Sequence, residues 1–284
     1  MKKLINHILV PVNFNSNTEL VMVKAIQAAN QFNSDIHLLY VQTGMLSIPF
    51  VYDGHFSGAI YNVSAEEAEK KMKKLIEEYQ HLLNDGLFMT TKISAGNWCF
   101  IIKEQVIIKH IDLIILPRTG KKAEGALLYK VNVNQLAQQT QCPILTVTKN
   151  FNIDHLQNIV VPLDDFLPIR KLTAATYLAK KFNGAIHLMG RKGQSAADDR
   201  KKSRCLTRAY QLLRDYTSVK VHCSVQDGYA VADDTLAYAK NIHADLIVVN
   251  TGKESRLKGW FSKWMGNYLY KESSIPVLTM APQS

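Results

Sequence analysis

Two adjacent carboxylates, Asp164 and Asp165, directly follow the apolar residues 159–163. Paired carboxylates can serve acid–base or metal chemistry when other ligands or a histidine lie close to them. Adjacent residues point to different sides of the chain, however, and no histidine or second acidic cluster is placed to complete such a site. The sequence therefore predicts neither a catalytic centre nor a metal site, and Asp164 is expected to contact a ligand or to cap a helix or turn.

A second polar stretch follows the apolar residues 111–116 and contains Arg118, Gly120 and Lys130. Glycine lets backbone N–H groups approach phosphate oxygens, and Arg or Lys side chains can add cationic contacts. These residue types could contact an anion, and the sequence offers no recognisable nucleophile or Mg²⁺-binding constellation.

The apolar runs before these residues have the character of buried parallel strands. Residues 8–12 read Ile-Leu-Val-Pro-Val, and residues 159–163 read Ile-Val-Val-Pro-Leu. Branched apolar residues without alternation are typical of strands covered on both faces, and proline cannot donate to a ladder. Pro11 and Pro162 are therefore expected to end their strands. The similarity between the two runs predicts a tandem repeat.

The repeat extends along the whole chain and divides it into two domains, 1–150 and 151–284. Pro11 and Pro162 are 151 positions apart, whereas Pro143 and Pro276 are 133 apart. The difference arises because most of a long segment, residues 42–63, has no counterpart in the second half. Each half alternates strands and helices five times, with capping boxes predicted at Ser16 and Ser64 and a helix predicted over residues 98–109.

This alternation predicts two doubly wound, parallel α/β domains with right-handed crossovers. Ligands of such sheets bind outside the carboxyl ends of the strands. In the first domain that crevice would collect Pro11, Asn13, Val41 and residues 117–120, and in the second it would collect residues 162–166, 190–191 and 250–253.

Composition narrows the classes of protein that are plausible. No apolar run reaches the roughly 18 residues of a membrane span, and the start of the chain lacks signal-peptide character, so a cytoplasmic protein without membrane contact is expected. The four cysteines are scattered without a CxxC motif, which predicts neither zinc nor disulfides. Much of the excess positive charge of the second half lies in a helix predicted between Arg191 and Arg214, with Ala209, Leu213 and Tyr216 expected inward. No nucleic-acid motif accompanies it, so a solvated helix face is favoured over nucleic-acid binding.

The order of several motifs resembles the universal stress protein family. These motifs are Val-Pro-x-Asp at 161–164, Ile-His-Leu-Leu-Tyr-Val at 36–41, Ala-Asp-Leu-Ile-Val-Val at 244–249 and Pro-Val-Leu-Thr at 276–279. The resemblance implies an adenine nucleotide alpha hydrolase-like fold with strand order 3-2-1-4-5 in each half, and pairing of the halves through their last strands. One branch of the family binds ATP or a related adenine nucleotide through Gly-x2-Gly-x9-Gly-Ser/Thr after strand four and an Asp after strand one.

In this chain the family pattern is only partly kept. Its loop positions fall on Pro117, Gly120, Lys130 and Val131, and its Asp position falls on Asn13 in the first half and Asp164 in the second. The nucleotide-binding positions that the resemblance implies are Pro11, Asn13, Val41, Arg118, Gly120, Lys130, Asp164 and Gly252.

The favoured interpretation is a cytoplasmic tandem universal stress protein that acts as a non-catalytic stress-response binding or regulatory module with degenerate nucleotide clefts. The alternative is a sensor that still binds ATP or AMP in one of the two clefts. A homodimer is expected, through aromatic residues 50–61 or the apolar run 260–265, and the protein partners are left unidentified.

Overall fold

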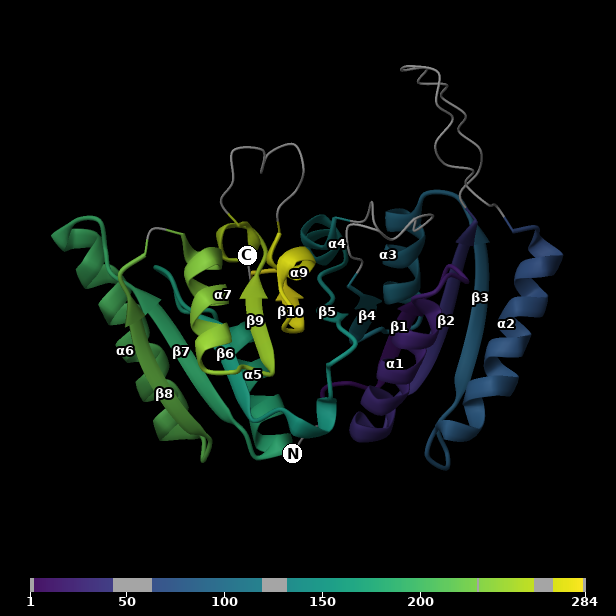
Figure 1. The fold of residues 1–284 in the computed structure, drawn as a ribbon, viewed down its shortest axis with the longest axis horizontal. Helices are drawn as coiled ribbons and strands as arrows, with labels where there is room; N and C mark the ends of the chain where they lie inside the picture. The colour runs from purple at the N-terminus through teal and green to yellow at the C-terminus, as the bar shows by residue number, and fades with distance from the viewer. Residues whose placement is uncertain (1–2, 43–62, 119–131, 229, 258–267, 283–284) are drawn as a thin grey trace, which may run out of the picture. The chain divides into compact units, whose positions relative to one another are not determined.

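The computed structural model describes residues 3–42, 63–118, 132–228, 230–257 and 268–282. These residues fall into two compact units, 1–132 and 133–284 (Figure 1). The predicted arms at 50–61 and 260–265, and the predicted site residues Gly120 and Lys130, lie outside the described residues.

The first unit contains a parallel sheet in the order β3-β2-β1-β4. Its strands are β1 (His7–Pro11), β2 (Asp35–Gln42), β3 (Met89–Ala95) and β4 (Leu113–Pro117). All five residues of β4 and the last four of β1 are buried, as expected for central strands. β1 ends at Pro11, as predicted, because proline has no N–H to continue the ladder.

Three helices and a short 3₁₀ turn cover this sheet: α1 (Thr18–Phe32), α2 (Ala65–Tyr79), η1 (Gln80–Leu82) and α3 (Trp98–Ile108). In Figure 1, α1 lies in front of the strands and α3 behind them. The predicted capping box at Ser64 is confirmed, since its hydroxyl accepts a hydrogen bond from the Glu67 N–H. The one predicted at Ser16 is wrong: α1 begins at Thr18 and its cap residue is Asn17, with no side-chain cap.

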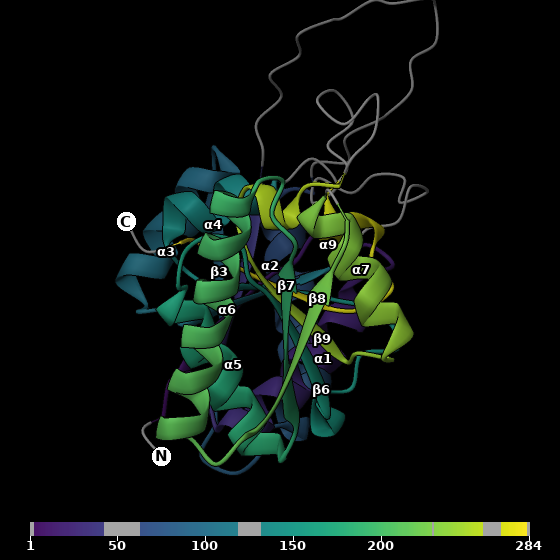
Figure 2. The same cartoon turned by 90° about the vertical axis from the view of Figure 1, so that its left-hand side faces the viewer.

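The second unit contains the strand order β5-β10-β9-β6-β7-β8 (Figure 1), and Figure 2 shows the paired strands β7 and β8 side by side. The strands are β5 (Ile144–Val147), β6 (Asn158–Pro162), β7 (Ala185–Arg191), β8 (Lys220–Gln226), β9 (Leu246–Asn250) and β10 (Val277–Met280). β6 to β10 run parallel in the predicted 3-2-1-4-5 order, and β5 pairs antiparallel with β10. β5 belongs to the second unit, which begins at residue 133. The division 1–150 and 151–284 follows the sequence repeat instead, and it stays a prediction.

The helical elements of the second unit are α4 (Val133–Thr140), η3 (Ile153–His155), α5 (Ile169–Phe182), α6 (Ala196–Tyr216), α7 (Val231–Asn241), η4 (Lys253–Ser255) and α9 (Leu269–Glu272). The basic helix predicted between Arg191 and Arg214 corresponds to α6, which spans Ala196–Tyr216, and Ala209 and Leu213 lie on its buried stripe. Tyr216 was expected to point inward, but it is the last residue of α6 and is 79% exposed.

The two repeats anchor their first strands in the same way. Asp112 precedes β4, and its carboxylate accepts hydrogen bonds from the backbone N–H groups of Asn6 and His7. Asp245 precedes β9, and its carboxylate accepts the corresponding bonds from Gln157 and Asn158. The sequence repeat is therefore also a repeat of side-chain roles, which allows the two halves to be compared position by position.

Candidate functional site

The carboxyl ends of β6, β7 and β9 bring together the polar residues that the sequence predicted for the second cleft. Asp164 lies two residues after β6, Arg191 is the last residue of β7, and Gly252 lies two residues after β9. β6 is hydrogen-bonded to both β7 and β9, so these residues meet at one edge of the sheet.

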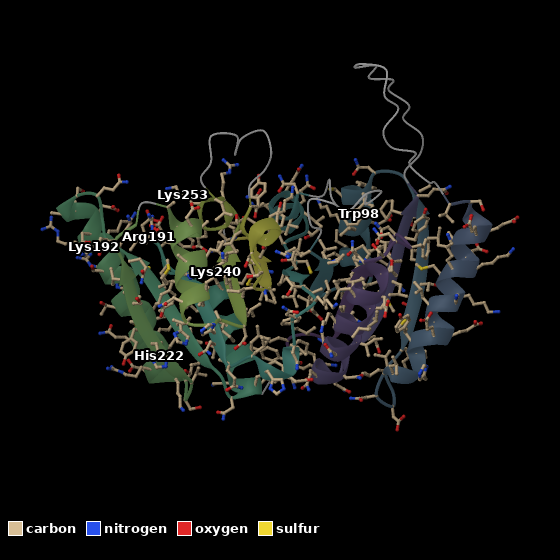
Figure 3. The ribbon with its side chains drawn as sticks, viewed as in Figure 1. Trp98, Arg191, Lys192, His222, Lys240 and Lys253 are labelled. Carbon is tan, nitrogen blue, oxygen red and sulfur yellow. The ribbon has the colours of Figure 1, made fainter. Side chains whose placement is uncertain are left out.

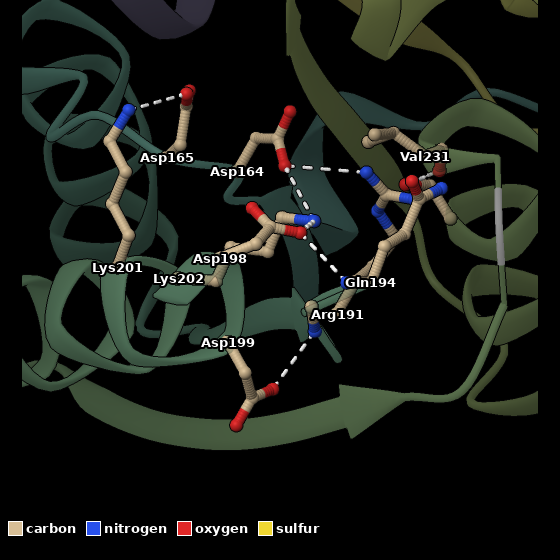
Figure 4. Close-up of polar contacts among 11 residues, drawn as sticks. Asp164, Asp165, Arg191, Gln194, Asp198, Asp199, Lys201, Lys202 and Val231 are labelled. Carbon is tan, nitrogen blue, oxygen red and sulfur yellow. Dashed lines mark hydrogen bonds and ion pairs between the residues drawn. The ribbon is translucent and has the colours of Figure 1, made fainter. Parts of the chain in front are cut away.

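Asp164 is held between two cations (Figure 4). Its Oδ1 lies 3.3 Å from Arg191 Nη2 and 3.8 Å from Lys202 Nζ, and the three side chains are only 9 to 11% exposed. Lys202 Nζ also lies 2.7 Å from Asp198 Oδ2. The carboxylate that the family pattern assigns to nucleotide binding is therefore engaged by the chain's own side chains.

Asp165 is oriented differently, as the sequence predicted for adjacent residues. Its Oδ2 lies 2.8 Å from Nζ of the exposed Lys201, and this hydrogen bond lowers the pKa of the Asp165 carboxyl. Asp164 and Asp165 thus have separate partners and do not form a carboxylate pair.

The start of α6 positions the cation beside Asp164. Ser195 caps this helix by accepting a hydrogen bond from the Asp198 N–H, and Asp198 in turn accepts one from the Gln194 N–H. The hydrogen bonds from Lys202 and Gln194 lower the pKa of the Asp198 carboxyl. Because Asp198 and Lys202 are four residues apart, their ion pair lies along one face of α6 and directs the ammonium toward Asp164.

A second ion pair lies deeper in the same cleft. Lys171, in the first turn of α5, places Nζ 2.5 Å from Glu254 Oε2 and 2.5 Å from the Pro162 carbonyl oxygen. Glu254 belongs to η4 and also accepts a hydrogen bond from the Asn250 N–H at 2.6 Å. The side chains of Lys171 and Glu254 are 0% and 5% exposed, and burial lowers the pKa of the Lys171 ammonium despite the carboxylate beside it.

The loop after β9 folds so that Glu254 can enter the cleft. Gly252 has φ 103°, a conformation that side chains rarely allow, and it precedes the single turn of η4. The family pattern would place an open, glycine-rich phosphate loop here, whereas this chain places the Glu254 carboxylate, which contacts the Lys171 ammonium and the Asn250 N–H.

In the part of the chain that the structure describes, a small cavity lies beside this ion pair. A cavity of about 50 Å³ is lined by residues 166–171, Asn250 and Pro282. Pockets for drug-sized ligands and cofactors measure roughly 300 to 1,000 Å³, so this cavity is far too small for a nucleotide.

The first unit carries a different arrangement at the carboxyl ends of its strands. Pro11, Val41 and Arg118 lie at or next to the ends of the adjacent strands β1, β2 and β4, as predicted. Asn13 follows β1, and its Nδ2 is buried with no hydrogen-bond partner in the described part of the chain. Phe14 lies beside it with its ring 4.8 Å from that of Tyr40.

Sequence reasoning missed Lys171, Glu254, Asp198 and the inward orientation of Lys202. Lys171 and Glu254 are 83 residues apart, and each has the appearance of an ordinary surface charge in its local sequence.

Within the described residues, no group of three or more His, Cys, Asp or Glu side chains could hold a metal ion. None of the helices in those residues has the length and hydropathy that a membrane crossing requires.

The strand order, the parallel pairing and the cleft at the carboxyl ends define a doubly wound α/β protein with an internal repeat. Comparison of the whole chain with solved structures agrees. A universal stress protein from Archaeoglobus fulgidus aligns with a TM-score of 0.67 at 16% identity, covering 98% of this chain and 97% of its own. A protein of unknown function from Pseudomonas aeruginosa aligns with a TM-score of 0.64 at 18% identity, covering 99% of this chain and 94% of its own.

Sequence comparison adds the family. The model of the universal stress protein family matches residues 5–148, half of the chain. A universal stress protein from Methanocaldococcus jannaschii is 26% identical over 151 residues, which cover 52% of this chain and 85% of the relative. The chain belongs to the universal stress protein family.

Proposed function

We propose that this protein is a non-catalytic binding or regulatory module of the stress response, active in the cytoplasm, in which the second nucleotide cleft is degenerate. The buried Lys171–Glu254 ion pair is the observation that carries this proposal. It fills the place of the phosphate loop with a negative charge whose partners are already satisfied.

Electrostatics argue against nucleotide binding in this second cleft. A bound phosphate would approach the Glu254 carboxylate, and the nearby cations Lys171, Arg191 and Lys202 are already paired with acidic side chains. Removing one member of a buried ion pair leaves an uncompensated charge, which costs about 3 to 5 kcal/mol. A nucleotide that separated one of these ion pairs would have to offset such a cost before its contacts contributed any net binding free energy.

The first cleft supports the second candidate function, a sensor of ATP or AMP. The unpaired, buried Nδ2 of Asn13 is a hydrogen-bond donor that a ligand could satisfy. Leaving a buried polar group without a partner costs about 1 to 3 kcal/mol, and binding would recover part of that energy. A nucleotide bound by this chain is therefore assigned to the first cleft, with Pro11, Asn13, Val41, Arg118, Gly120 and Lys130 as its predicted surroundings.

A thermal-shift titration with ATP, AMP and inorganic phosphate, with and without Mg²⁺, tests both proposals. A ligand present at about 100 times its dissociation constant stabilises the unit that binds it by about 2.7 kcal/mol. A non-binding module shows no nucleotide-specific shift at moderate salt. A sensor shows a shift that Asn13→Ala abolishes and Asp164→Ala preserves, whereas the reverse pattern would contradict the assignment of the second cleft as degenerate.

A further inference from the structure

A cavity of about 240 Å³ opens between the last turn of α3 and the strands β1, β2 and β3. Leu9 and His37, which line it, are the third residues of β1 and β2, so the cavity lies toward the amino ends of the strands. The nucleotide clefts of such sheets lie outside the carboxyl ends instead. We call this cavity the α3 pocket, and it is separate from the candidate site described above.

His37 forms a neutral wall of the α3 pocket. Its Nδ1 lies 2.8 Å from Thr90 Oγ1, and its Nε2 lies 3.2 Å from His7 Nδ1. Burial, together with the nearby His7 and Lys109, lowers the pKa of His37 to about 4. At neutral pH the ring is therefore uncharged and both of its nitrogens have partners, so His37 shapes the pocket without supplying charge to it.

The remaining walls of the α3 pocket combine apolar surface with positive charge. Leu9, Leu39 and Ile108 supply the apolar part, and Lys92 and Lys109 line the same cavity. Among the described residues neither lysine forms an ion pair, and none of those that line the pocket is acidic. The pocket therefore offers two ammonium groups with which no described carboxylate pairs.

The second repeat fills the equivalent space with a side chain. His187 corresponds to His37 in the register of the strands. Tyr238 of α7 corresponds to Gln105 of α3, since each is the eighth residue of an eleven-residue helix. Tyr238 Oη lies 3.4 Å from His187 Nδ1, and the ring of His222, labelled in Figure 3, lies 4.8 Å from that of His187. Gln105 is shorter than tyrosine and leaves the space beside His37 open.

The second repeat also lacks the positive charge of the α3 pocket. Ser224 stands at the position of Lys92 in the strand register, and Ile242 stands at the position of Lys109 directly after the helix. One copy of the fold thus forms without the open space and without either lysine. Both features are particular to the first unit, and their coincidence in one cavity indicates a binding function.

We propose that the α3 pocket binds a small organic carboxylate with an apolar body. The carboxylate pairs with Lys92 and Lys109. The body packs against Leu9, Leu39 and Ile108. Pockets for drug-sized ligands begin at roughly 300 Å³, so this cavity takes a ligand smaller than a nucleotide. Inorganic phosphate would pair with the lysines but leave the apolar walls uncovered.

NMR titration of the isotopically labelled full chain with benzoate tests this proposal. Benzoate is expected to shift the resonances of pocket residues such as His37 and Thr90, with a dissociation constant of about 1 mM or below for a ligand of its size. Benzamide has the same shape without the charge and should bind at least about threefold more weakly. Acetate has the charge without the ring and should bind at least about tenfold more weakly.

Substitutions taken from the second repeat locate the site. Gln105→Tyr introduces the ring that fills the equivalent space, and it should abolish the binding of both benzoate and benzamide. Lys92→Ser and Lys109→Ile each remove one cation, so each should weaken benzoate binding at least about twofold without weakening that of benzamide. Lys103→Met changes an exposed lysine of α3 that does not line the pocket, and this control should leave both affinities unchanged.

Four results would overturn the proposal. Two of them concern the parent protein: no shift up to about 10 mM benzoate, or equal affinity for benzoate and benzamide. The others are benzoate binding to a folded Gln105→Tyr protein, and benzoate binding that Lys92→Ser and Lys109→Ile both leave unchanged. Circular dichroism shows which variants are folded, and the two lysine variants decide alone if Gln105→Tyr is not. Asn13→Ala should leave benzoate binding intact, so this proposal and the nucleotide sensor succeed or fail independently.

Discussion

Replacing Lys171 by methionine tests whether the second cleft depends on its buried ion pair. The side chain is fully buried, and its ammonium contacts both Glu254 and the Pro162 carbonyl. Methionine has a similar length, so the change removes the charge without opening a large cavity. The Glu254 carboxylate is left buried with only the Asn250 N–H as a partner, and the expected loss of unfolding free energy is about 3 to 5 kcal/mol.

The double variant Lys171→Met with Glu254→Gln separates the strength of the pair from the cost of a single unpaired charge. Removing both charges of a buried pair is often neutral or stabilising, so the double variant should recover most of the stability lost in Lys171→Met. The exposed pair Lys192–Asp227 provides a matched control, and Lys192→Met should leave the melting temperature unchanged.

Urea unfolding followed by circular dichroism, supported by calorimetry, measures these differences. For a unit of this size, a loss of 3 to 5 kcal/mol corresponds to a fall of roughly 6 to 20 °C in melting temperature. A Lys171→Met protein as stable as the parent would refute the reasoning, because the buried carboxylate would then need no cation. A double variant less stable than Lys171→Met would refute it as well.

Two further predictions concern acid stability and the Asp164 cluster. Burial and the neighbouring His7 lower the pKa of His37 from 6.5 to about 4, so the folded state binds fewer protons than the unfolded state between these values. Stability should therefore fall as the pH drops from 6.5 toward 4, and His37→Gln should make this dependence shallower in urea titrations at several pH values. A histidine NMR titration of His37 near pH 6.5 would contradict this expectation. Asp164→Ala leaves the nearly buried cations Arg191 and Lys202 side by side and should lower the unfolding free energy by about 1 to 3 kcal/mol in urea titrations. An unchanged free energy would mean that solvent already neutralises this cluster.

The strands were accessible from the sequence because their signals are local. Buried parallel strands consist of continuous apolar runs, and the prolines at 11 and 162 mark where two of them end. The repeat indicated that both halves share one topology, and the strand order 3-2-1-4-5 was implied by the resemblance to the universal stress protein family. The Ser64 cap was predicted for the same reason, because its hydrogen bond spans only three residues.

The buried ion pair in the second cleft was not accessible from the sequence, because its two residues are far apart in the chain. Lys171 and Glu254 meet only after the strands between them have formed, and nothing in either neighbourhood distinguishes them from solvated charges. Helix α3 illustrates another difficulty. Its apolar residues lie on several sides, with Ile102 buried and Phe100, Ile107 and Ile108 exposed, so the apolar pattern alone does not show which side is buried.

The buried ion pair also constrains how this protein can evolve. Loss of the lysine or the glutamate alone would leave a single charge in an apolar interior, and that intermediate would be far less stable than the present protein. Because natural proteins retain only a small margin of stability, selection would remove most chains at that step. Apolar residues could replace the pair readily only if both positions changed together. The two positions are in this sense coupled in evolution, although 83 residues separate them in the chain.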